Sequence, residues 1–111
     1  MRVATLEDRD HIHNLILENW DNVSDDYSQK EIIYFDPEKM ITFIDDGFVA
    51  TLYPITNVLA DCHIISVKGD TDNLMYECAE WVIKHTTIRS LMAHVPVFNE
   101  RCRKMVERLG F

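Results

Sequence analysis

The chain has few of the residues that break secondary structure or cross-link a fold. Its three glycines and three prolines among 111 residues exclude a collagen-like or low-complexity chain. The three cysteines are widely spaced and odd in number, which indicates neither a disulfide framework nor a zinc knuckle. They are Cys62, Cys78 and Cys102, and we expect buried thiols. Because hydrophobic residues make up 47% of the chain, we expect one folded domain over residues 1–111.

Basic residues are also scarce, since 11 Lys and Arg stand against 19 Asp and Glu and give a net charge of −8. Nucleic-acid phosphates require a basic footprint, so we expect no nucleic-acid partner. No apolar run approaches the roughly 18 to 20 residues of a membrane helix, and the first residues lack the layout of a signal peptide. We therefore expect an acidic, cytoplasmic protein without a membrane partner.

The first residues predict a short strand followed by a helix. Thr5 can cap that helix, with Asp8 as the acid of a capping box. His11 and His13 lie two residues apart on the helix, so their side chains diverge, and we expect no metal site. Residues 21–29 are polar and acidic, and we interpret them as a loop or a short helix.

From residue 40 onward the pattern changes to strands followed by further helices. The turn Asp45-Asp46-Gly47 contains the Asp-Gly signal of a β-hairpin. An amphipathic helix is predicted over 72–85, and a last helix begins at the cap Asn99 and ends at Gly110. The predicted strands cover 40–44, 48–53, 58–67 and 88–95.

This order of elements predicts an α+β fold with a mixed, mostly antiparallel sheet and helices on both faces. The strands that end near Val67 and Val95 should run parallel and diverge, because the helix over 72–85 makes a crossover between them. The apolar positions predict a core of Ile12, Leu15, Ile16, Phe43, Phe48, Val49, Leu52, Ile64, Leu74, Cys78, Trp81, Val82, Leu91, Met105 and Leu109.

The two ends of the chain carry a family resemblance. The last helix is capped by Asn99, carries an apolar stripe and stops at Leu109-Gly110-Phe111, which resembles the closing motif of the GNAT acyltransferase superfamily. The opening strand, the Ala4-Thr5 pair and the acid Asp8 are similar to the beginning of these proteins. The stretches 61–63, 79–86 and 92–96 look like the small GNAT-like proteins of tailed bacteriophages.

The resemblance implies a single GNAT-like domain that is short at its C-terminal end. Members of the superfamily usually continue past this Gly-Phe with one or two more strands. We therefore expect an open sheet edge near residues 88–95, where a second copy of the chain or another protein could pair.

The resemblance also implies acetyl-CoA as the acyl donor. In this superfamily, backbone amides at a helix start hold the pyrophosphate, within a motif Arg/Gln-x-x-Gly-x-Gly/Ala. The matching junction here, residues 66–73, has one glycine and one lysine but lacks the paired glycines and the arginine of the motif. The residues expected to hold the donor are Val67, Lys68, Gly69, Thr71, Asn73 and Asn99.

Three residues depart from the family pattern. Asp70 and Asp72 would lie near the pyrophosphate, and unit charges about 4 Å apart interact at roughly 4 kcal/mol at an effective dielectric of about 20. Val106 stands where many members have a tyrosine that protonates the departing thiolate. The alternative interpretation of the junction is a polar turn before a capped helix.

His63 is the expected general base, with His94 as a second candidate, because imidazole has an unperturbed pKa near 6.5. Strand alternation places His63 on one face with Asp61 and Ile65. The alternative is a structural histidine. The resemblance implies that the segment between the first two strands lines the acceptor site, where Asp21, Asp25 and Asp26 could attract a cationic amine; the alternative is a solvated acidic loop.

Two functions remain open from the sequence. The first is an acyl-CoA-dependent N-acyltransferase with an unidentified acceptor. The second is a catalytically inactive GNAT-fold module for binding or virion assembly of a phage, acting in the cytoplasm of a bacterial host or within the virion.

Overall fold

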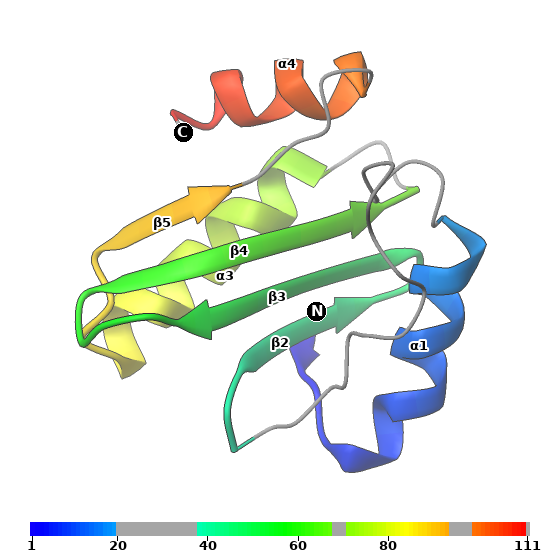
Figure 1. Ribbon diagram of the computed structural model, residues 1–111, viewed down its shortest axis with the longest axis horizontal. Coiled ribbons are helices and arrows are strands. Elements are labelled where there is room, and N and C mark those ends of the chain that lie inside the picture. Colours follow the sequence, from blue (N-terminus) through cyan, green and yellow to red (C-terminus); the bar gives the residue numbers. More distant parts are fainter. Residues whose placement is uncertain (20–37, 68–70, 94–98, 111) are drawn as a thin grey trace.

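The computed structural model describes residues 1–19, 38–67, 71–93 and 99–110. These residues form five strands, one short 3-10 helix and three α-helices (Figure 1). In chain order the elements are β1 (Arg2–Val3), η1 (Leu6–Asp8), α1 (Arg9–Glu18), β2 (Ile41–Asp45), β3 (Phe48–Pro54), β4 (Leu59–Ser66), α3 (Thr71–His85), β5 (Ser90–Ala93) and α4 (Glu100–Arg108).

The five strands form one mixed sheet in the order β1-β2-β3-β4-β5. Neighbouring strands are antiparallel from β1 to β4, whereas β4 and β5 run parallel. The predicted mixed sheet and the predicted crossover through α3 are therefore confirmed. The expected divergence concerns residues after Ala93, of which 94–98 lie outside the described part of the chain.

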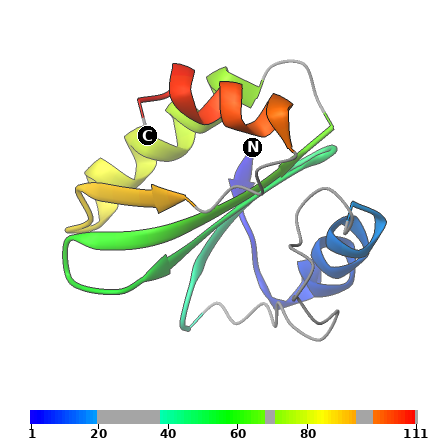
Figure 2. The same cartoon turned by 45° about the horizontal axis from the view of Figure 1, so that its top comes forward.

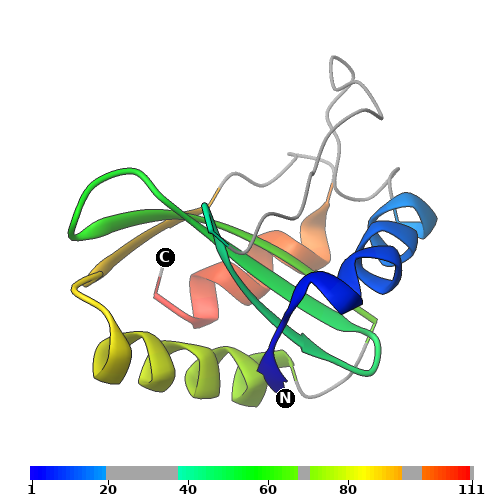
Figure 3. The ribbon, with the colours of Figure 1, turned by 90° about the horizontal axis from the view of Figure 1, so that it is seen from below.

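Helices cover both faces of this sheet, as expected. α1 lies on one face, and α3 and α4 lie together on the other (Figure 3). A view from a different side shows α4 crossing beside α3 (Figure 2). The α3 side holds the larger apolar core, built around Phe43, Phe48, Leu52, Leu74, Cys78 and Val82. The α1 side holds a smaller core, built around Ile12, Leu15, Ile16, Ile44, Val49 and Ile65.

The predicted core is confirmed at most of its positions. Four of its members are only partly buried and pack against the larger core: Ile64, Trp81, Leu91 and Leu109. Trp81 has its ring edge-on to Phe43 with centroids 5.3 Å apart, and it stacks on His85 at 4.5 Å. His85 is exposed, so the stacked face of Trp81 lies at the rim of the core.

The predicted hairpin turn, the cap at Asn99 and the Asp8 contact of the capping box are confirmed. Thr5, however, precedes the 3-10 helix η1, and its side chain makes no cap hydrogen bond. Asp45 pairs with Phe48 across the hairpin, and Gly47 adopts a φ of 67°, which glycine reaches without steric cost. The Thr5 N–H donates to Asp8 Oδ2 at 2.8 Å, as a capping box requires. The Asn99 Oδ1 accepts the N–H of Cys102 at 3.1 Å, and Gly110 follows α4 with a φ of 88°.

Several predicted boundaries differ from the structure by one or two residues. The strand expected from residue 88 begins at Ser90, because the N–H groups of Arg89 and Ser90 both donate to the Val58 carbonyl, at 2.8 and 2.9 Å. β4 accordingly begins at Leu59, and Pro54 ends β3 opposite Ala60. Within the described residues, no helix is long and apolar enough to cross a membrane.

Candidate functional site

His63 lies on β4 and shares a face with Asp61 and Ile65, as the strand alternation predicted, and Ile65 shows that this is the α1 side of the sheet. The register partner of His63 is Thr51 of β3, and its neighbour on the same face of β4 is Asp61. The His63 Nε2 atom is 3.6 Å from Asp61 Oδ2, which is an ion-pair distance and longer than a hydrogen bond. The side chain of His63 is 49% exposed and that of Asp61 is 23% exposed, so solvent and a ligand can reach the imidazole.

The α1 side of the sheet changes from apolar to polar along the strands. Ile44, Val49 and Ile65 form one row across the sheet and pack against α1. The next row on the same face holds Thr42, Thr51 and His63. The two threonines are buried, and their hydroxyl oxygens are 3.2 Å apart, so one donates to the other.

The polar rows beyond α1 can serve acid–base chemistry. A buried hydroxyl pair keeps the sheet face beside His63 polar without leaving a hydroxyl unsatisfied. Asp61 lies 3.6 Å from Nε2 of His63 without a hydrogen bond to it, so the neutral imidazole ring has a nitrogen that can accept a proton from a bound group. The structure therefore brings His63 together with Asp61 and Thr51, a grouping that residue spacing alone predicts only for Asp61.

The junction between β4 and α3 follows the carboxyl end of β4. Val67 donates its backbone N–H to the Gly47 carbonyl at 2.9 Å, and its side chain is 59% exposed. The hydroxyls of Ser66 and Thr71 are 2.7 Å apart, which brings the two ends of the junction together. Thr71 is buried, so its side chain turns toward the core. Lys68 and Gly69 lie outside the described residues.

Asp72 has a partner that sequence reasoning missed. Arg108 of α4 donates from Nε and Nη2 to its two carboxylate oxygens, both at 3.1 Å. The bidentate guanidinium contact holds the pKa of Asp72 below its usual range. The negative charge expected at the start of α3 is therefore offset by a cation from a helix 36 residues away. Asn73, in the same first turn, is exposed.

A shallow apolar groove of about 220 Å³ lies between α3, β5 and the end of α4. Met75, Tyr76, Ala79, Leu91, Leu109 and Gly110 line it. The Arg108–Asp72 pair links α4 to the first turn of α3, next to this groove. The groove is therefore an apolar surface close to the polar first turn of α3.

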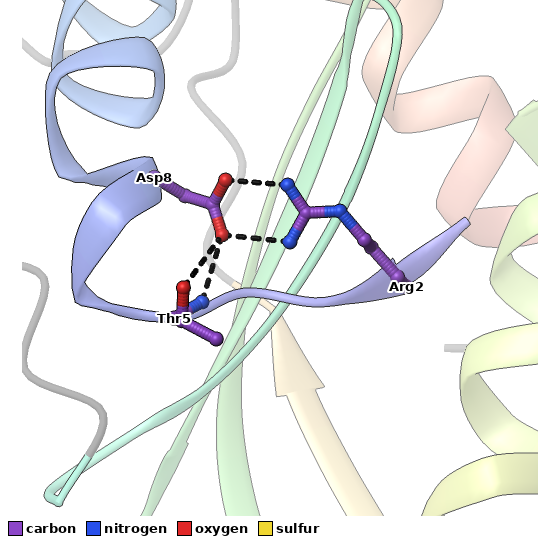
Figure 4. Close-up of polar contacts among 3 residues, drawn as sticks. All are labelled: Arg2, Thr5 and Asp8. Carbon is purple, nitrogen blue, oxygen red and sulfur yellow. Dashed lines mark hydrogen bonds and ion pairs between the residues drawn. The ribbon is translucent and has the colours of Figure 1, made fainter.

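A second, larger depression of about 490 Å³ lies at the outer edge of the sheet near β1 and α1. Arg2 and Asp8 line it and form a bidentate ion pair, with Nη1 to Oδ2 at 2.8 Å and Nη2 to Oδ1 at 2.5 Å. Figure 4 shows the Asp8 carboxylate between Arg2 and Thr5. The carboxylate binds the guanidinium of a β1 residue and the backbone N–H that precedes η1. The capping role of Asp8 followed from the sequence, whereas its pairing with Arg2 did not.

The three cysteines are free thiols, and burial makes two of them unreactive. Desolvation raises the pKa of Cys62 and that of Cys78 to about 12 each, and it also raises the pKa of the half-buried Cys102. Among the residues that the structure describes, no three His, Cys, Asp or Glu side chains converge in a way that could hold a metal ion.

Several predicted site residues fall outside the described ranges. They include His94, Asp70 and the acids Asp21, Asp25 and Asp26 of the loop after α1. Comparison of the chain with protein-family models, with curated proteins and with solved structures gives no match.

Proposed function

We propose that the chain is an acyl-CoA-dependent N-acyltransferase of the GNAT type, which transfers an acyl group to a primary amine. The observation that carries this proposal is the His63–Asp61 pair on the open face of β4, the strand that leads directly into the start of α3. The order of elements and the parallel β4–β5 pair joined by α3 support it, because the resemblance at both chain ends implies this arrangement.

In the proposed reaction, the amine nitrogen attacks the thioester carbonyl carbon. The C–N bond forms, the C–S bond breaks, and the sulfur leaves and takes a proton from solvent. The imidazole of His63 accepts the proton that the nitrogen loses. Asp61 lies 3.6 Å from Nε2 of this ring, and its negative charge attracts the imidazolium that forms.

The proposed donor site is the start of α3, where free backbone N–H groups and the helix dipole favour a pyrophosphate. Val67, Lys68, Gly69, Thr71, Asn73 and Asn99 would hold acetyl-CoA, which supplies the activated acyl group. Thr71 stands where the family motif has a small residue that lets the pyrophosphate approach the backbone. Its side chain is buried in the core, so it does not occupy the space that the pyrophosphate would need. Arg108 also supports the fit, because it offsets the charge of Asp72.

A second candidate is a catalytically inactive module for binding or virion assembly. It is favoured by the internal contacts of the same junction. The Val67 N–H, the Thr71 hydroxyl and the Asp72 carboxylate each have a partner within the chain. Such groups would have to exchange partners before they could contact a ligand.

Calorimetric titration with acetyl-CoA separates the two. We expect a dissociation constant tighter than about 100 μM, equivalent to roughly −5.5 kcal/mol. The Asp72→Asn variant should bind more tightly, because it frees the Arg108 guanidinium and removes a negative charge beside the pyrophosphate. Glu80→Gln is the matched control, since it removes a carboxylate paired with Lys84 on the same helix.

An activity assay tests the proposed role of His63 as the general base. His63→Gln should lower amine-dependent thiol release by about 10²-fold or more while acetyl-CoA binding is kept. His13→Gln, at an exposed histidine of α1, should leave both unchanged. If the wild-type chain gives no heat with millimolar acetyl-CoA, the acyltransferase proposal is wrong and the binding module takes its place.

A further inference from the structure

Three side chains from three neighbouring strands form a row on the α1 side of the sheet. Tyr53 of β3 lies opposite Asp61 of β4, and Asp61 lies opposite Met92 of β5. Residues that pair across a sheet project to the same face, and the face of Asp61 is also that of His63. We call Tyr53, Asp61 and Met92 the platform.

The two ends of the platform are open to solvent, whereas the side chain of Asp61 between them is 23% exposed and its Oδ1 atom is buried. Tyr53 is 45% exposed and Met92 is 37% exposed, although both are large and hydrophobic. The three residues belong to neither of the two apolar cores found in the described part of the chain. α1 packs against the row of Ile44, Val49 and Ile65, two rows away along the strands. An exposed tyrosine and an exposed methionine therefore flank a partly buried carboxylate, and together they form the surface that a ligand would meet.

The chemistry of this surface favours a cation. The face of the Tyr53 ring is negative, the Met92 thioether is polarisable and accepts weak hydrogen bonds, and Asp61 carries a full negative charge. None of the three attracts an anion, and the chain as a whole has a net charge of −8. The Nε2 atom of His63 lies 3.6 Å from Asp61 Oδ2, so a group bound at the carboxylate also lies beside the imidazole ring.

We infer that the platform binds a primary alkylammonium group. A primary ammonium has N–H donors for the Asp61 carboxylate, and its alkyl chain can lie over the Tyr53 ring and the Met92 side chain. The inference rests on the proposed function, because it assigns the amine acceptor to the same site as His63. It adds the class of acceptor, a cationic primary alkylamine, and the three residues that recognise it.

The test is a chemical-shift titration of the chain with butylammonium, with no acyl donor present. Saturable shifts should appear at Tyr53, Asp61, His63 and Met92, and neutral n-butanol should not produce them. Asp61→Asn should weaken binding by about tenfold or more, as expected for a hydrogen bond between charged groups. Tyr53→Leu should weaken it by about two- to fivefold, the usual size of an exposed cation–π contact.

Matched variants control for general charge and surface effects. Tyr76→Leu removes an exposed tyrosine of α3 on the other side of the sheet, and Asp46→Asn removes an exposed carboxylate of the β2–β3 turn. Neither should change butylammonium binding. The inference fails if butylammonium gives no saturable shifts at the platform, if n-butanol gives the same ones, or if Asp46→Asn weakens binding as much as Asp61→Asn.

Failure of the inference can be told apart from failure of the proposed function. Butylammonium binding at the platform, without any acetyl-CoA binding, keeps the platform and overturns the acyltransferase. Acetyl-CoA binding with His63-dependent turnover, but without alkylammonium binding at the platform, overturns the platform and keeps the acyltransferase.

Discussion

Asp8 shows how one side chain can join a strand to a helix. It accepts the N–H of Thr5 at 2.8 Å and holds both terminal nitrogens of Arg2. The Arg2 guanidinium, together with the Thr5 N–H, holds the pKa of Asp8 well below its usual range. Its ionised form is therefore bound more favourably in the folded chain than in the unfolded one.

This contact predicts a specific pH dependence of stability. Because the folded-state pKa of Asp8 is lowered, its contribution is complete above the unfolded pKa near 3.9 and is lost as the pH falls toward the folded value. Asp8→Asn should lower the free energy of unfolding by about 1 kcal/mol at pH 7, the usual size of a lost helix cap. Urea denaturation should show this difference shrinking below about pH 4.

Asp10→Asn is the matched control for Asp8. Asp10 is exposed and lies in the first turn of α1, so the substitution removes the same charge from almost the same place. It should change stability by less than about 0.5 kcal/mol at any pH. Equal effects of the two variants at pH 7 would show that the contacts of Asp8 with Arg2 and Thr5 contribute no stability.

At the scale of elements, α3 contacts the sheet through a fully buried stripe with a partly buried rim. Leu74, Cys78 and Val82 are buried in the larger core, whereas Trp81 is only partly buried. Phe43 of β2 is fully buried and contacts the edge of Trp81. Removal of the Phe43 ring and removal of the Trp81 ring should therefore lower the free energy of unfolding by different amounts.

Phe43→Ala should destabilise the chain by about 3 to 5 kcal/mol, the range for a buried aromatic side chain. Trp81→Ala should lower the free energy of unfolding by less, about 2 kcal/mol. One face of the indole stacks on the exposed side chain of His85, so removal of the ring leaves a smaller buried cavity. Chemical denaturation of both variants measures the order. A larger loss for Trp81→Ala would contradict the partial burial of this side chain.

The polar contacts between elements also act at this scale. Arg108 and Asp72 connect α4 to α3, and both side chains are substantially exposed, so the pair contributes little to stability. Its effect is on the charge at the start of α3, the helix end on which the proposed donor site depends. This is why Asp72→Asn tests ligand binding and not folding.

At the scale of the whole molecule, the two edges of the sheet differ. β1 has two residues, and one of them, Arg2, is charged and bound to Asp8. β5 has four uncharged residues, Ser90–Ala93, and among the described strands it pairs with β4 alone. Short and charged strands block unwanted pairing, so β5 is the edge at which another strand can add.

We therefore predict that two copies of the chain pair through β5. Light scattering at high micromolar concentration should show a dimer, and amide exchange over 90–93 should slow as concentration rises. Ser90→Lys should shift the equilibrium toward monomer, because it adds a charge to the edge. Ile83→Lys, at an exposed position of α3, is the control. A monomer at all concentrations would refute pairing between copies.

Much of the architecture followed from the sequence, because its causes are local. The caps at Thr5 and Asn99 and the glycine after α4 depend on residues within one helical turn. The Asp45-Asp46-Gly47 turn and the apolar stripe of α3 likewise depend on spacing along the chain. Once these elements are known, the parallel pairing of β4 with β5 follows from the crossover through α3.

The remaining features were decided by the tertiary structure alone, because they join residues that are distant along the chain. Arg108 meets Asp72 across 36 residues, and the partial burial of Trp81 depends on how far α3 lies over the sheet. The sequence placed His63 and Asp61 on one face. Only the register of three strands brings Tyr53 and Met92 beside that pair, because a shift of one residue in either pairing would turn those side chains to the opposite face.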